Sequence, residues 1–119
     1  MPREDLQRKV DIAYLSAFYG GLLTERQRLI LSLHCEEDLS LAEIAEEVGI
    51  SRQAVHEALN HATDRLFRLE AQLGVAERFR RMQAGLENAL DALNHHEDEQ
   101  ARQLIEALLA LDQEDPDGI

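Results

Sequence analysis

Hydrophobic residues recur every three or four positions along most of this chain, which is the spacing of amphipathic helices. The pattern predicts helices over residues 4–19, 25–35, 41–48 and 52–73, another from about residue 76, and a last one around residues 104–111. Ala, Leu, Glu and Arg dominate the composition and Trp is absent, so helix formers outweigh strand formers. We therefore expect an all-α fold.

The same spacing defines the apolar positions of the first two helices. Along residues 4–19 they are Leu6, Val10, Ala13, Tyr14, Ala17 and Phe18. Along residues 25–35 the predicted buried side is Leu29, Ile30 and Leu33. Thr24 precedes this second helix and Gln27 stands three residues on, which is the spacing of a capping box.

Residues 40–60 predict two short helices joined by a glycine turn. Ser40 can cap the first helix, and the Glu43 carboxylate can bond back to the Ser40 N–H as a second capping box. Gly49 follows that helix at a point where the chain must turn with positive φ. Two capped helices around a glycine turn are typical of a helix-turn-helix.

The second helix of this pair has a polar side that is suited to DNA. Ser51 is its expected cap, and Ala54 and Val55 are expected to face inward. The side chains left pointing outward are Arg52, Gln53, His56, Glu57 and Asn60. In a DNA-reading helix such positions contact base edges and phosphates, where Arg suits guanine or phosphate and Gln suits adenine.

This second helix is longer than a minimal reading helix needs. Its apolar positions follow a heptad seam, which consists of Val55, Leu59, Ala62, Leu66, Leu69 and Leu73. A helix over residues 52–73 would be about 33 Å long. Its second half is expected to pack on the N-terminal helices or on another subunit. Because of this seam, we predict a homodimer.

The charge of the chain limits how it can bind nucleic acid. The net charge is −12, whereas nucleic-acid-binding proteins usually present a basic face. Residues 51–68 are locally less acidic, because Arg52, Arg65 and Arg68 outnumber the carboxylates there. A specific, salt-sensitive contact with DNA is therefore expected, without strong non-specific affinity.

Composition and motifs argue against several other classes of protein. Cys35 is the only cysteine, so the chain has no internal disulfide, and we expect this thiol to be buried. No secretion signal or membrane span is evident, and we predict a cytoplasmic protein. His95 and His96 lie in a polar connector over residues 94–99 that is more typical of a solvated loop than of a metal site. No phosphate cradle or nucleophile motif is present, and we predict no enzymatic activity and no cofactor.

Three blocks of the sequence resemble the YlxM-like family of small bacterial proteins. They are YG and LLTERQ at residues 19–20 and 22–27, EDLSLAEIA at residues 37–45, and GISRQAV at residues 49–55. The resemblance covers about residues 14–75, and nothing from Ala76 onward matches it. It implies a helix-turn-helix similar to the fourth region of bacterial sigma factors, a helical dimer, and a role in transcription regulation. It also implies a link to the signal recognition particle, whose genes neighbour those of the family.

Carried onto this sequence, the resemblance gives a set of candidate DNA-binding residues. The groove-facing ones are Ser51, Arg52, Gln53, His56 and Asn60, and Ser40 and Thr24 would place helix N-termini near phosphates. Capping alone would account for the serines and the threonine. His56 and Glu57 differ from the Tyr and Asp that relatives often carry.

We predict a helix-turn-helix domain over residues 1–75 and a C-terminal helical extension over residues 76–119, ending in an acidic tail at residues 112–118. Two functions fit these observations. In the first, the protein is a DNA-binding regulator that takes part in the signal recognition particle pathway. In the second, it is an adaptor that docks on the targeting machinery or on RNA polymerase, which the exposed glutamates of residues 41–48 favour.

Overall fold

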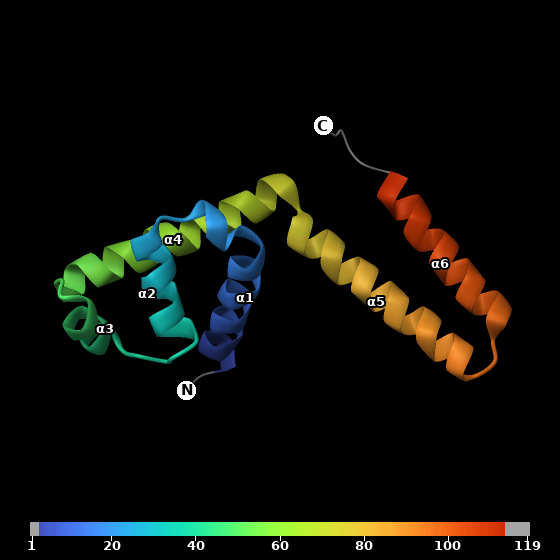
Figure 1. Ribbon diagram of the computed structural model, residues 1–119, viewed down its shortest axis with the longest axis horizontal. Helices are drawn as coiled ribbons and strands as arrows, with labels where there is room; N and C mark the ends of the chain where they lie inside the picture. Colours follow the sequence, from blue (N-terminus) through green and yellow to red (C-terminus); the bar gives the residue numbers. More distant parts are fainter. Residues whose placement is uncertain (1–2, 114–119) are drawn as a thin grey trace. The chain divides into compact units, whose positions relative to one another are not determined.

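A computed structural model describes residues 3–113 of the protein, and this part of the chain is helical without a strand. In chain order its elements are α1 (Arg3–Tyr19), the 3-10 helix η1 (Gly20–Leu22), α2 (Glu25–Cys35), α3 (Leu41–Val48), α4 (Arg52–Leu73), α5 (Val75–Asn94) and α6 (Asp98–Gln113) (Figure 1). The predicted all-α fold is confirmed. Residues 112 and 113 of the predicted acidic tail belong to α6, and the rest of that tail lies outside the described residues.

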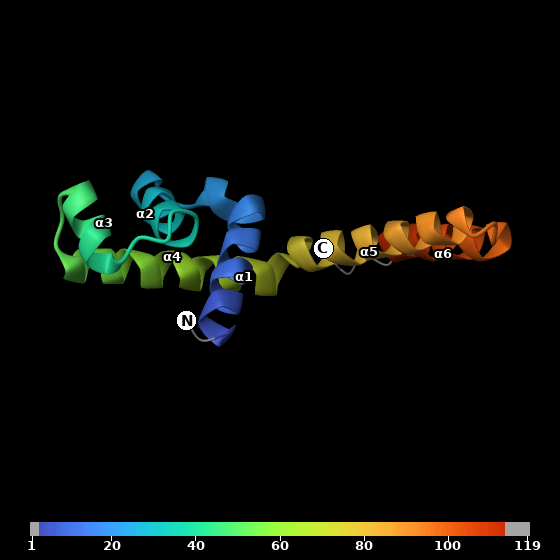
Figure 2. The same ribbon diagram turned by 90° about the horizontal axis from the view of Figure 1, so that it is seen from below.

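The chain divides into two compact units, Met1–Ala76 and Glu77–Ile119. In the first unit α4 contacts α1, α2 and α3, so this one helix is the platform on which the other three assemble (Figures 1 and 2). The second unit consists of the rest of α5 and of α6. That each unit folds as a domain of its own stays a prediction.

Local capping determines where α2 and α3 begin. The Thr24 hydroxyl accepts a hydrogen bond from the Gln27 N–H, and the Gln27 side chain accepts one from the Thr24 N–H. Ser40 and Glu43 form the same reciprocal pair: the Glu43 N–H donates to Ser40 Oγ over 3.1 Å, and the Ser40 N–H donates to Glu43 Oε1 over 2.8 Å. Both predicted capping boxes are confirmed. Each satisfies two backbone N–H groups that the first turn of a helix leaves without a partner.

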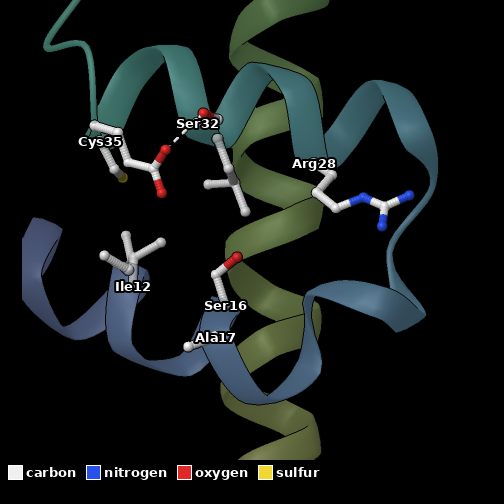
Figure 3. Close-up of a pocket in the computed structure, with 9 residues that line it drawn as sticks. Ile12, Ser16, Ala17, Arg28, Ser32 and Cys35 are labelled. Atoms are coloured by element: carbon white, nitrogen blue, oxygen red, sulfur yellow. Dashed lines mark hydrogen bonds between the residues drawn. The ribbon is translucent and has the colours of Figure 1, made fainter.

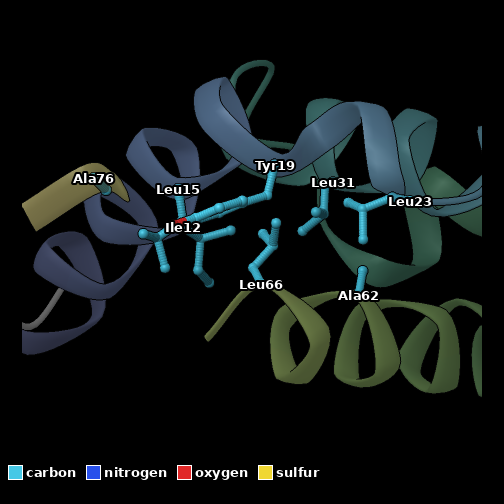
Figure 4. Close-up of a cluster of buried hydrophobic side chains, with 8 residues drawn as sticks. All are labelled: Ile12, Leu15, Tyr19, Leu23, Leu31, Ala62, Leu66 and Ala76. Atoms are coloured by element: carbon cyan, nitrogen blue, oxygen red, sulfur yellow. The ribbon is translucent and has the colours of Figure 1, made fainter. Parts of the chain in front are cut away.

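A first hydrophobic cluster joins α1, α2 and the second half of α4 (Figure 4). Leu66 is fully buried at its centre and Ala62 lies beside it on α4. The buried residues around them are Ile12, Leu15, Tyr19, Leu23, Leu31 and Ala76. Burying a side chain such as Leu66 contributes about 1.5–3 kcal/mol, so this cluster anchors the far half of α4 within its own unit.

A second cluster holds the helix-turn-helix together. Ile30 of α2, Ile44 of α3 and Val55 of α4 are each fully buried in it. Together the two clusters cover the predicted heptad seam, of which only Leu73, at the end of α4, is largely exposed. The seam therefore packs on the helices of its own chain and leaves little apolar surface for a second subunit.

The buried faces of α1 and α2 agree only in part with the predicted apolar positions, since Tyr14 and Phe18 pack against the first cluster and Ile30 and Leu33 belong to or pack against the second. In α1 the buried residues are Ile12, Leu15 and Tyr19, whereas Leu6 and Val10 are more than half exposed. In α2 the buried residues are Ile30 and Leu31, and Leu29 is exposed. Both helices carry apolar residues on more than one side, and the contact with α4 selects between those sides.

Tyr19 fastens the end of α1 to the junction between α4 and α5. Its buried hydroxyl donates to Glu70 Oε1 over 2.5 Å and accepts from the Val75 N–H over 3.1 Å. Glu70 Oε1 also accepts from the Ala76 N–H. Burial and the Glu70 carboxylate raise the pKa of Tyr19 above its ordinary value. The network supplies partners for two N–H groups at the start of α5.

In the second unit α5 and α6 form an antiparallel pair (Figure 1). Small buried residues, Ala89, Ala92 and Ala101, let the two helices approach each other. The connector is shorter than predicted, because residues 98 and 99 already belong to α6, where their carboxylates suit a helix N-terminus. The large apolar residues left exposed on this pair are Phe79, Leu86, Leu90, Leu93, Ile105 and Leu109. We call these six residues the hairpin stripe.

Candidate nucleic-acid interface

The predicted helix-turn-helix is present as α3, a tight turn and α4. Gly49 has φ +81° and its N–H donates to the Ala45 carbonyl, which also accepts from the Ile50 N–H. A residue with a Cβ is strained at this φ, so glycine is suited to the position. Ile50 is half-buried beside the second cluster and fixes the corner between the two helices.

The outward-facing set on α4 is exposed as predicted. Val55 is fully buried and Ala54 is half-buried, and these two positions determine the rotation of α4. The side chains on the opposite side, all exposed, are Arg52, Gln53, His56, Glu57 and Asn60. Their position on a helix whose other face is locked into a core means that the set is presented in a fixed orientation. That they bind DNA stays a prediction.

The first turn of α4 is electrostatically unlike that of its neighbours. The α2, α3, α5 and α6 helices each carry a carboxylate in the first turn, whereas α4 carries none and has Arg52 at its first position. Ser51 caps α4 by accepting from the Ala54 N–H over 3.0 Å. A cation beside a helix N-terminus opposes the helix dipole by about 0.3–1 kcal/mol. Arg52 is therefore unfavourable for the helix but well placed to meet an anion.

Two side-chain pairs order the rest of this face. The Gln53 amide donates to Glu57 Oε2 over 3.4 Å, and the Asn60 amide lies 3.1 Å from His56 Nε2. Both pairs are one helical turn apart, which restrains their side chains before any ligand binds. Glu57 is also the one carboxylate within the outward set, and it repels phosphate.

Ser40 is placed differently from the other candidate residues. Its hydroxyl accepts from the Glu43 N–H, and the Glu43 carboxylate already occupies the N-terminus of α3. A phosphate approaching that helix end would meet a like charge. The arrangement accounts for Ser40 as a cap, and its predicted contact with DNA has no support beyond the resemblance.

Cys35 lies in a groove between α1 and α2, away from the outward set. The groove has a volume of about 320 Å³, and its walls include Ile12, Ser16, Ala17, Arg28 and Ser32 (Figure 3). The thiol is half-buried rather than buried, because it belongs to the last turn of α2. Burial raises its pKa, which Glu36 also raises and Lys9 lowers. A thiol with a raised pKa is a poor nucleophile at neutral pH.

Two further tests concern metals and membranes. Within the described part of the chain, the acidic, histidine and cysteine side chains form no group of three that could hold a metal ion. Over the same residues, no helix is both long enough and apolar enough to cross a membrane.

Sequence reasoning missed the cations that α1 brings next to α4. Arg8 and Lys9 line a groove together with His56 and Asn60, although about fifty residues separate the two pairs in the chain. No local spacing could indicate this neighbourhood, since it depends on how α1 crosses α4.

Comparison with known proteins places these features in one family. The family described as "Putative helix-turn-helix protein, YlxM / p13 like" (UPF0122) matches residues 6–108. A UPF0122 protein of Symbiobacterium thermophilum is 44% identical over 90% of this chain and 97% of its own length. UPF0122 proteins of Desulforamulus reducens and Bacillus mycoides are 39% and 37% identical, over 80% and 90% of this chain and 81% and 99% of their own lengths. The match extends through α5 and into α6, which corrects the expectation that the resemblance ends at residue 75.

Proposed function

This chain belongs to the UPF0122 family, the YlxM/p13-like helix-turn-helix proteins, and we propose that it regulates transcription by binding DNA and not by catalysing a reaction. The observation that carries the proposal is the first turn of α4, where Arg52 and Gln53 are exposed at a helix end without a carboxylate. Such a turn, held by a buried Val55, can enter the major groove and meet base edges and phosphates.

The charges of the protein indicate what kind of DNA binding to expect. The helix-turn-helix presents one local cationic turn on a chain whose net charge is −12. Non-specific affinity comes from many phosphate contacts, which an acidic protein does not offer. Binding should therefore depend on sequence and weaken steeply as salt is added. The protein would act in the cytoplasm, where bacterial DNA lies, and it would need no cofactor.

We also propose a homodimer, now with a different interface from the one that the seam predicted. The hairpin stripe exposes six large apolar residues on a pair of helices that buries mainly alanines. A unit of about forty residues rarely buries a sufficient core alone. Two such hairpins packed through their stripes would form a four-helix bundle. A two-fold dimer would also present two reading helices to two half-sites.

A second candidate function is a protein adaptor. The outer side of α3 exposes Glu43, Glu46 and Glu47 beside the reading face, and these residues repel DNA. They suit a basic protein surface instead. The hairpin stripe would then bind a partner such as RNA polymerase or a component of the targeting machinery, which the resemblance to the family suggests.

Selection from a pool of random duplexes, followed by fluorescence anisotropy, tests the first function. We expect saturable binding to selected duplexes that weakens between about 50 and 200 mM salt. The signal recognition particle RNA serves as a second probe, because the family resemblance links the two. Binding to no nucleic acid would favour the adaptor, whereas binding to this RNA alone would make the protein an RNA binder.

The chain offers a matched control for the substitution of Arg52 and Gln53. Replacing Arg52 and Gln53 together by alanine should weaken binding roughly tenfold or more, since each base contact is worth about 1–3 kcal/mol. Arg102 and Gln103 are the same pair of residue types, also exposed and helical, in α6. Replacing them by alanine should leave DNA binding unchanged while removing the same charge.

A further inference from the structure

The groove that α1 forms with α4 continues the reading face of α4. It has a volume of about 400 Å³, and His56 and Asn60 of the outward set form part of its wall. Arg8 and Lys9 of α1 also line it, as does His34 of α2. The apolar side chains that complete the lining are Ile12 of α1, Leu31 of α2, Leu41 of α3 and Leu59 of α4. Four of the helices therefore position one cationic groove directly beside the helix that is proposed to read DNA.

The groove is unusual for the charge of its lining. No carboxylate lines it, although the chain has twice as many acidic as basic residues. Four other grooves on the described surface each include at least one carboxylate, from Glu36, Asp64, Asp98 and Asp38 respectively. This groove is thus a local cationic site on an acidic molecule.

Arg8 is held in place over α4. Its guanidinium carbon lies 5.5 Å from the centre of the Phe67 ring, which is a cation–π contact. No described carboxylate forms an ion pair with it. Lys9 differs, because its ammonium pairs with Asp38 at 2.5 Å. Arg8 therefore supplies the positive charge that an incoming anion can use.

The position of Arg8 along α4 fits the path of a DNA backbone. Phe67, which the guanidinium covers, is seven residues beyond Asn60, or about 10 Å along the helix. The major groove is about 12 Å wide. If the first turns of α4 lie in the major groove, a cation about 10 Å further along the helix comes close to the phosphates at the edge of that groove.

We propose that Arg8 and the groove beside it bind a phosphate of the nucleic-acid backbone that flanks the bases read by α4. The inference rests on the proposed function and extends its contact surface to α1. A single guanidinium beside apolar side chains binds an isolated anion only weakly. It is effective as one of several contacts between the protein and a duplex that α4 already holds. Because phosphates carry no sequence, Arg8 should add affinity without specificity.

The test measures the salt dependence of binding to two selected duplexes of different sequence. Arg8→Gln should weaken both by the same factor and reduce the slope of log K against log salt by about one. Arg8→Lys keeps the charge and should keep most of the slope. Arg102→Gln, which removes an exposed charge from α6, is the control and should change neither quantity.

A second variant acts on the groove in the opposite direction. Asp38→Asn removes the partner of Lys9, which frees a second cation at the groove. It should tighten binding to both duplexes and steepen the slope. Thermal unfolding of each variant verifies that the fold is retained.

The outcomes separate this inference from the proposed function. If the wild type binds no nucleic acid, the proposed function itself fails. If the wild type binds and the alanine pair at Arg52 and Gln53 weakens binding roughly tenfold or more, the proposed function stands. If Arg8→Gln then leaves the slope unchanged, only the present inference is overturned. A loss for one duplex sequence alone would also overturn it, because Arg8 would then read bases. Inorganic phosphate that displaced the duplex at micromolar concentration would assign the groove to a free anion instead.

Discussion

At the start of α4, helix stability and the proposed DNA binding favour opposite charges. Arg52 opposes the helix dipole, whereas the first turns of α2 and α3 carry glutamates that support it. We therefore predict that Arg52→Glu raises the free energy of unfolding by about 0.5–1 kcal/mol while abolishing DNA binding. Urea denaturation and anisotropy measure the two effects. A loss of stability on this change would show that Arg52 supports the fold.

Glu57 has the opposite relation to DNA. It is the one carboxylate of the outward set, and it accepts a hydrogen bond from Gln53. Replacing it by glutamine removes a charge that repels phosphate and releases the Gln53 amide. We predict that Glu57→Gln tightens binding to all duplexes, with a smaller difference between selected and random sequences. Unchanged binding to random duplexes would place Glu57 away from the DNA, and weaker binding would show that it makes a favourable contact; either result contradicts the prediction.

At the scale of elements, the contact between α1 and the segment before α3 gives the protein a dependence on pH. Lys9 holds the pKa of Asp38 below its usual value, through a hydrogen bond and through its charge. Because this pKa is lower in the folded than in the unfolded chain, the contribution to stability is present above the unfolded pKa. It is lost as the pH falls through the folded one.

Asp38→Asn should therefore lower the free energy of unfolding at neutral pH and have little effect in acid, where the wild-type carboxyl is protonated. Asparagine is the suitable replacement because residue 38 has φ +58°, which Asn and Asp tolerate better than other side chains. Urea denaturation over an acid pH series measures the change. A destabilisation that is the same at every pH would contradict the assignment to this ion pair.

The junction of α4 with α5 depends on the hydroxyl of Tyr19. Tyr19→Phe removes the donor to Glu70 and the acceptor for the Val75 N–H, and leaves both without this partner in a part-buried site. We predict a loss of about 1–3 kcal/mol in the free energy of unfolding. Hydrogen exchange should show the largest loss of protection at the N–H groups of residues 75 and 76. Unchanged stability would mean that water replaces the hydroxyl.

The elements also show what the sequence could predict. Capping boxes and the turn at Gly49 involve residues within a few positions of each other, so their chemistry is visible locally, and the helix-turn-helix followed from them. The apolar positions of α1 could not be divided into buried and exposed ones, because apolar residues occur on several sides of that helix. Only the distant contact with α4 decides between them. The groove containing Arg8 was missed for the same reason, since it joins residues far apart in the chain.

At the scale of the whole molecule, the hairpin stripe holds six of the thirteen large apolar residues that are exposed among the described residues. We predict that sedimentation at micromolar concentration gives twice the 13.5 kDa mass of the chain. Leu90→Lys, in the middle of the stripe, should give a monomer with unchanged helix content. Leu22→Lys is the control, because Leu22 is equally exposed but lies in η1. A wild-type monomer at this concentration would exclude the dimer.

The proposed function depends above all on the first turn of α4 reading DNA. The most direct measurement is an anisotropy titration of one selected duplex with the wild type, the variant with alanine at Arg52 and Gln53, and the variant with alanine at Arg102 and Gln103. We expect the first pair of substitutions to weaken binding roughly tenfold or more, with the fold intact, and the second pair to have no effect. Equal affinity for all three proteins would show that the first turn of α4 does not read DNA.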